Sequence, residues 1–127
     1  MRKVELTLSS NYVANWTLVD AVRELFQNAI DQGDWYYNYK DKENALWITN
    51  EKATLEMNTL LLGTSNKAKG SIGQFGEGYK IAALVLLREG KELCIYNGNE
   101  IWRPRMVKSR RFGTEILTFF IEKPMFL

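Results

Sequence analysis

The chain has 127 residues, of which 46% are hydrophobic and 25% are charged, and its formal net charge is +2. This length fits one domain over residues 1–127 with a buried core, and so small a net charge does not by itself indicate a nucleic-acid partner. The sequence contains no histidine. The commonest general base and metal ligand is therefore excluded, and any catalysis must use carboxylates, lysine or hydroxyl groups.

Three features predict a cytoplasmic protein without a membrane span. Residues 1–7 alternate like a strand and lack the apolar block of a signal peptide. The longest apolar run, 81–87, is far too short to cross a membrane. The single cysteine, Cys94, cannot form an internal disulfide, and its apolar neighbours predict a buried thiol in a strand.

In chain order, the first half predicts an edge strand, a helix that stops at Gly33, an aromatic connector, a strand and a short helix. These elements span residues 3–8, 18–32, 34–44, 46–49 and 55–62. The second half predicts an apolar helix and three strands, with an Asn97-Gly98 hairpin turn between the first two strands. These span residues 79–88, 92–96, 100–103 and 114–121. The order predicts a two-layer α+β sandwich with helices on one face of a mixed β-sheet.

Three polar residues, Glu24, Asn28 and Asp31, share one face of the predicted helix. Their i, i+4, i+7 spacing places them in a stripe of about 60° that borders the apolar face. A carboxylate there can orient and deprotonate water, and an amide oxygen is a hard ligand suited to Mg²⁺. An ordinary amphipathic helix with a polar boundary is the alternative interpretation.

A glycine-rich motif runs directly into the apolar helix, with the sequence Gly73-Gln74-Phe75-Gly76-Glu77-Gly78-Tyr79-Lys80. Glycines let successive backbone N–H groups converge on an anion, and the helix adds its N-terminal donors and its positive dipole end. Upstream, Gly63-Thr64-Ser65-Asn66-Lys67 supplies hydroxyls and a lysine, so the span 63–78 could close as a lid over a nucleotide. The motif is neither a Walker A loop nor a Rossmann fingerprint, and a mobile surface loop is the alternative.

Together these segments resemble the GHKL ATPases, the family of type II topoisomerases, MutL proteins, sensor histidine kinases, ninety-kilodalton heat-shock chaperones and MORC proteins. Residues 24–31 match the family's N-box, E-L-x-x-N-x-x-D, and 63–67 with 72–80 look like its ATP lid and second glycine box. The lid is most similar to MORC-like and phage-type members. Phe112-Gly113-Thr114 resembles the late glycine-threonine strand start. The resemblance implies the Bergerat ATP-binding fold, with ATP and Mg²⁺ as cofactors.

The resemblance also implies roles for the matched positions. Glu24 would be the general base that activates water, Asn28 would hold Mg²⁺ at the phosphates, and Asp31 would support the pocket floor. Thr114 would help to close the adenine side. The remaining nucleotide contacts would come from Thr64, Ser65, Lys67, Gly73, Gln74, Phe75, Gly76, Glu77, Gly78 and Lys80.

Two departures from the family shape the functional hypothesis. The first glycine box, D-x-G-x-G, is absent from residues 49–55, and Asn50 is the nearest substitute for the aspartate that accepts the adenine amino proton. The downstream domain that supplies a γ-phosphate lysine in topoisomerases and MutL proteins has no room before residue 127. We therefore expect slow hydrolysis that couples the nucleotide state to a protein partner. The alternative is a non-catalytic GHKL-fold interaction or inhibitor protein, of a kind that would suit a phage or mobile element.

Two further clusters have open interpretations. The first is basic, lies near Trp102 and could contact nucleic acid or form a solvated loop: Arg103, Arg105, Lys108, Arg110 and Arg111. The second is aromatic and could stack on a base, but packing against the helices is the favoured use: Trp35, Tyr36, Tyr37 and Tyr39.

Overall fold

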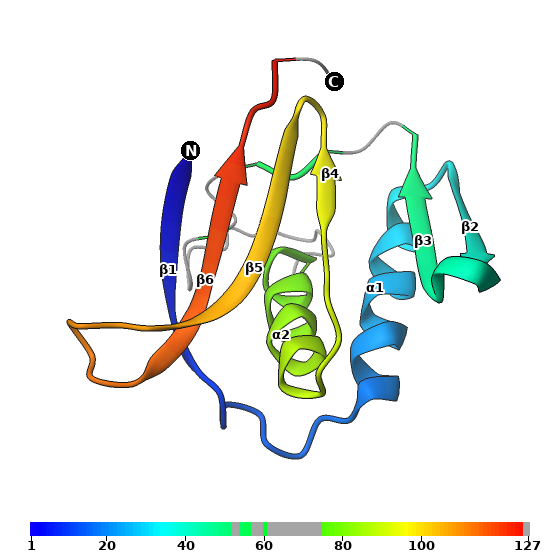
Figure 1. Cartoon of the computed structure of the whole chain (residues 1–127). Coiled ribbons are helices and arrows are strands. Elements are labelled where there is room, and N and C mark those ends of the chain that lie inside the picture. Colours follow the sequence, from blue (N-terminus) through cyan, green and yellow to red (C-terminus); the bar gives the residue numbers. More distant parts are fainter. Residues whose placement is uncertain (52–53, 57–59, 61–74, 126–127) are drawn as a thin grey trace.

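The computed structural model describes residues 1–51, 54–56, 60 and 75–125 (Figure 1). Its described strands form a four-stranded sheet in the order β1-β6-β5-β4 and a separate β2–β3 hairpin. The two described α-helices are α1 (Leu18–Gln32) and α2 (Phe75–Arg88). The strands are β1 (Arg2–Ser9), β2 (Trp35–Lys40), β3 (Ala45–Asn50), β4 (Ile95–Asn97), β5 (Glu100–Lys108) and β6 (Glu115–Glu122), and a 3-10 turn, η1 (Asp41–Glu43), joins β2 to β3.

The chain is an α+β protein, but the strand directions differ from the mixed sheet that the sequence predicts. Every strand pair in the described residues is antiparallel. Short connections impose the antiparallel direction on three of these pairs. A short turn reverses the chain between β2 and β3, between β4 and β5, and between β5 and β6. The predicted Asn97-Gly98 turn is confirmed: Asn97 pairs with Glu100, and Gly98 has φ +63°.

One face of the four-stranded sheet carries the main core. The buried side chains on this face come from β1, β5 and β6: Leu6, Leu8, Trp102, Leu117, Phe119 and Ile121. Helix α2 covers them with Tyr79, Ala83 and Leu84. The Tyr79 ring lies 6.5 Å from the Trp102 ring and 6.1 Å from the Phe119 ring, centroid to centroid. This aromatic group joins the helix to the centre of the sheet.

Helix α2 is apolar on more than one side because it packs on two partners. While Ala83 and Leu84 face the sheet, Ala82 and Val85 belong to a second buried cluster with Ala21 of α1. A helix buried on two sides needs apolar residues around most of its circumference. Small alanines at the crossing let the backbones of α1 and α2 approach closely, which matters for the site described below.

The β2–β3 hairpin packs on the other side of α1 (Figure 1). The Phe26 ring of α1 meets the Trp35 ring at 6.0 Å and the Tyr37 ring at 5.5 Å, both edge-on. The predicted packing of the aromatic cluster against the helices is thus confirmed for Trp35 and Tyr37. The predicted connector over 34–44 is wrong, because these aromatic residues, which favour strands, form β2.

Other boundaries also differ from the sequence-based expectation. Cys94 is exposed and precedes β4, so the predicted buried thiol in a strand is wrong. β5 extends beyond the predicted strand 100–103 to Lys108, which places Arg105 and Lys108 in a strand rather than in a solvated loop. The predicted helix over 55–62 lies largely outside the described residues, and Leu55 and Glu56 are not helical.

A single guanidinium group fixes the loop between β1 and α1. Arg88, the last residue of α2, donates from Nη1 to the carbonyl oxygens of Ser10 and Tyr12, both at 3.1 Å. Its Nη2 donates to the carbonyl oxygens of Val13 and Trp16, at 3.4 and 3.0 Å. These four bonds tie the loop to the end of α2, so Arg88 sets where α1 begins relative to α2.

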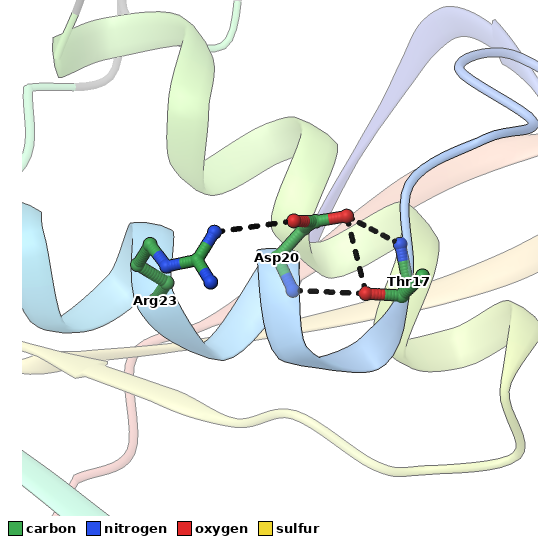
Figure 2. Close-up of polar contacts among 3 residues, drawn as sticks. All are labelled: Thr17, Asp20 and Arg23. Atoms are coloured by element: carbon green, nitrogen blue, oxygen red, sulfur yellow. Dashed lines mark hydrogen bonds and ion pairs between the residues drawn. The ribbon is translucent and has the colours of Figure 1, made fainter.

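The first turn of α1 is closed by a reciprocal capping box (Figure 2). The Asp20 backbone N–H donates to Thr17 Oγ1 at 3.2 Å, and the Thr17 backbone N–H donates to Asp20 Oδ2 at 2.8 Å. Arg23 Nη1 also donates to Asp20 Oδ1, at 3.3 Å. The Thr17 backbone hydrogen bond, followed by the Thr17 hydroxyl and the Arg23 charge, holds the pKa of Asp20 below its ordinary value of 3.8.

This lowered pKa makes the contribution of Asp20 to stability depend on pH. A carboxyl group with a depressed folded-state pKa stabilises the fold above its unfolded-state pKa and loses this effect as the pH falls through the folded-state value. We expect Asp20→Asn to be less stable than the parent at pH 7, and the difference should narrow below about pH 4. Urea unfolding of both proteins from pH 7 to pH 3 measures this; a constant difference over the whole range would contradict it.

Candidate functional site

The candidate site begins where α1 and α2 touch. Glu24, half-buried on α1, places its carboxylate directly over the Cα atom of Gly78 in the first turn of α2. A Cβ atom built at Gly78 would overlap Glu24 Oε2 and would lie 2.6 Å from Glu24 Cδ. Glycine is therefore the only residue that leaves the Glu24 carboxylate where it is. The structure thus brings together two of the residues that the sequence predicts to act on one ligand.

Asn28 lies one turn after Glu24 on α1 and is half-buried. Asp31, another turn on, is exposed, and its Oδ1 accepts a hydrogen bond from Gln27 Nε2 at 2.9 Å. The three residues of the predicted stripe therefore differ in their surroundings. Glu24 contacts α2, Asn28 is half-buried one turn later, and Asp31 is exposed at the surface. The described contact of Asp31 is this hydrogen bond with Gln27, and its role at a pocket floor stays a prediction.

Asn50 has a structural task at the end of β3. Its Nδ2 donates to the carbonyl oxygens of Ala29 and Gly33, both at 3.0 Å. These two bonds cap the C-terminal end of α1, where helix carbonyl groups lack partners within the helix. Both amide hydrogens are used, so only Oδ1 is left to accept a hydrogen bond from a ligand such as the adenine amino group.

Much of the predicted glycine motif and lid lies outside the described residues, namely Thr64, Ser65, Lys67, Gly73 and Gln74. Phe75, Gly76 and Glu77 are the first residues of α2, so this helix begins four residues before the predicted start at Tyr79. Two glycines close to a helix start normally argue against helix. The close approach of the Glu24 carboxylate explains why a glycine, Gly78, is present in the first turn of this helix.

Lys80 and Thr114 lie in opposite environments. The Lys80 side chain is only 1% exposed, so its ammonium group is inside the protein near the start of α2. Thr114 lies in the turn before β6 and is exposed; its carbonyl oxygen accepts a hydrogen bond from the Ser109 backbone N–H at 2.9 Å.

A shallow hollow of about 410 Å³ opens beside Glu24 on the N-terminal half of α1. It is lined by Asn15, Trp16, Asp20, Arg23, Glu24 and Gln27. Sequence reasoning missed every lining residue except Glu24. The Thr17-x-x-Asp20 spacing, which is the signature of a capping box, was the available signal that residues near the start of α1 are held in place.

The donor set for a metal ion is small. Within the described parts of the chain no three histidine, cysteine, aspartate or glutamate side chains gather to hold an ion. Mg²⁺ does not require such a group, because it commonly binds through one or two protein ligands together with phosphates and waters. The Asn28 amide oxygen, with the Glu24 carboxylate one turn away, fits that kind of partial coordination.

Comparison with protein families, curated proteins and solved structures found no match to this chain. No helix in the described residues is long and apolar enough to span a membrane. Evidence for a function therefore comes from the geometry of the chain itself and from the motif resemblance.

Proposed function

We propose that the chain is a GHKL-type domain with a Bergerat fold that binds ATP and Mg²⁺, hydrolyses ATP slowly and passes its nucleotide state to a protein partner. The observation that carries the proposal is the contact between Glu24 and Gly78. It joins the two motifs that define the resemblance, the N-box on α1 and the second glycine box on α2, although they are 54 residues apart in the sequence (78 minus 24).

The chemistry follows from the placement of each group. The backbone N–H groups in the first turn of α2 have no partners within the helix, and they favour phosphate oxygens. Mg²⁺, when bound, would neutralise phosphate charge, and Asn28 would be its protein ligand. Glu24, half-buried beside the start of α2, would accept a proton from an attacking water near the γ-phosphate.

The direct test is a calorimetric titration of ATP with and without Mg²⁺. We expect a Kd of about 1 mM or tighter with Mg²⁺, which corresponds to about −4 kcal/mol, and weaker binding after chelation of the metal. Asn28→Ala should remove most of the metal dependence, while Asn99→Ala, which removes an exposed amide from the turn between β4 and β5, should not. No binding of any adenine nucleotide at about 5 mM would rule the proposal out.

Two contacts favour a second candidate, a GHKL-fold protein that binds a partner without catalysis. The Asn50 amide hydrogens hold the end of α1, and Asp31 is engaged by Gln27, so two of the nucleotide-facing positions serve structure. A measurement of phosphate release separates the candidates, because the non-catalytic protein would show no ATP turnover that depends on Glu24.

A further inference from the structure

The four-stranded sheet has a second face that points away from α2; on it Ile116 and Thr118 are buried, whereas Arg105 is exposed. Strand register assigns its residues, because side chains of paired residues point to the same side. Arg103 pairs with Phe120, which pairs with Lys3; Arg105 pairs with Thr118. These residues alternate with the buried Trp102, Phe119 and Leu117, so they point away from α2. We call this side of the sheet the outer face.

The β2–β3 hairpin continues the outer face beside β4. Trp35 and Tyr37 point toward Phe26 of α1, so the alternating residues of the hairpin, among them Trp47 and Lys40, point the other way. The Trp47 ring stacks on the Tyr96 ring of β4, with centroids 5.9 Å apart and an interplanar angle of 6°. Lys40 Nζ lies 5.3 Å from the Trp47 ring centroid. Two strands that share no hydrogen-bonded ladder are thus joined by aromatic rings.

These rings remain largely open to solvent. Trp47 is 40% exposed and Tyr96 is 55% exposed, values that are high for side chains of this size in a folded protein. The two rings pack on each other, and both still keep a large exposed surface. Exposed aromatic rings next to each other supply stacking surface for a ligand that has flat rings of its own.

The outer face is also cationic. Lys3, Lys40, Arg103 and Arg105 make no ion pair with any described carboxylate, and the only carboxylates on the paired strands of this face are Glu5 and Glu122. The Nε atom of Arg103 is buried without a hydrogen-bond partner in the described chain. A hydrogen bond with Cys94 holds the pKa of Tyr96 above its ordinary value of 10, so the phenol adds no negative charge at neutral pH.

From this combination we propose that the outer face binds single-stranded nucleic acid. Trp47 and Tyr96 would stack on bases, and Arg103, Arg105, Lys3 and Lys40 would contact phosphates. A single strand fits better than a duplex because only unstacked bases present their ring faces to aromatic side chains. An acidic protein would match the charge but would leave the parallel rings without a role.

The test is fluorescence anisotropy with a labelled thymidine oligonucleotide of about 20 nucleotides at about 50 mM salt. Trp47→Ala is expected to weaken binding about tenfold, the size of effect found for one stacked base. Arg105→Ala should weaken binding and should lower the salt slope of log Kobs by about 0.7, because it removes one phosphate contact. Arg105 is exposed on the sheet, so this variant remains informative even if Trp47→Ala is poorly folded.

Two matched controls lie away from the outer face. Tyr12→Ala removes an exposed aromatic ring from the loop before α1, and Arg23→Ala removes an exposed cation from α1. Both should bind within about twofold of the parent, since neither removes a stacking ring or a phosphate contact from the outer face.

Three results would overturn the proposal. The first is no binding at about 100 µM protein in low salt, and the second is equal weakening by the control variants. The third is equal competition by duplex DNA or polyglutamate, which would make the face a general anion or acidic-protein site. Glu24→Gln should bind the oligonucleotide like the parent, so failure of this proposal and failure of the ATP proposal are separate outcomes.

Discussion

Replacing Arg88 with alanine is expected to lower the free energy of unfolding by about 3 kcal/mol. The guanidinium group donates to four carbonyl oxygens of the loop between β1 and α1, and two of these bonds, to Val13 and Trp16, are partly buried. Hydrogen bonds from a charged donor each contribute roughly 1.5–3 kcal/mol, and bonds from one group are not additive. Chemical denaturation of the parent and the variant measures the difference.

The controls for this prediction separate geometry from charge. Arg88→Lys keeps the charge, but an ammonium group cannot span four carbonyl oxygens, so it should recover less than half of the loss. Lys91→Ala removes an exposed cation three residues later and should change stability by less than about 0.5 kcal/mol. A loss of less than about 1 kcal/mol for Arg88→Ala would show that water molecules replace the four hydrogen bonds from Arg88.

The elements that the sequence predicts well are those whose signals are local. The predicted helix 18–32 matches α1 because Thr17 caps its first turn and Gly33, at φ +76°, ends it. The hairpin at Asn97-Gly98 likewise depends on one glycine with positive φ. In both cases the residues that decide the boundary lie within four positions of it.

The missed features depend on contacts between distant residues. Nothing near Arg88 in the sequence indicates carbonyl partners 72 to 78 residues away. The helical start of α2 depends on how closely α1 approaches Gly78, and the capping role of Asn50 depends on the position of β3 beside the end of α1. Cys94 is exposed and lies before β4, which starts at Ile95, three residues later than the predicted strand start at residue 92.

The same division applies to the candidate site. The motif resemblance selects Glu24 and Gly78, and the structure brings them into contact. The resemblance also selects Asp31 and Thr114, which are both exposed in the described structure. Motif matching identifies residue types in order along the chain, whereas packing decides which of them meet.

Glu24→Gln is expected to lower ATP hydrolysis by about 100-fold or more while ATP binding with Mg²⁺ stays within about threefold. The amide keeps the shape and the contact with α2 but cannot accept a proton from water. Gly78→Ala tests the geometry independently, because its methyl group would displace the Glu24 carboxylate. It should lower hydrolysis by about tenfold or more even though Glu24 is still present, since a misplaced base loses its effect steeply.

The two variants together decide what the contact between α1 and α2 does. Steady-state phosphate release gives the hydrolysis rate, and calorimetry gives binding for the same samples. If Gly78→Ala lowers hydrolysis and Glu24→Gln does not, the glycine serves phosphate binding or helix packing and the general base lies elsewhere. If both variants hydrolyse ATP like the parent, Glu24 is not the base, and the close approach of α1 to α2 at Gly78 is a packing feature of the fold.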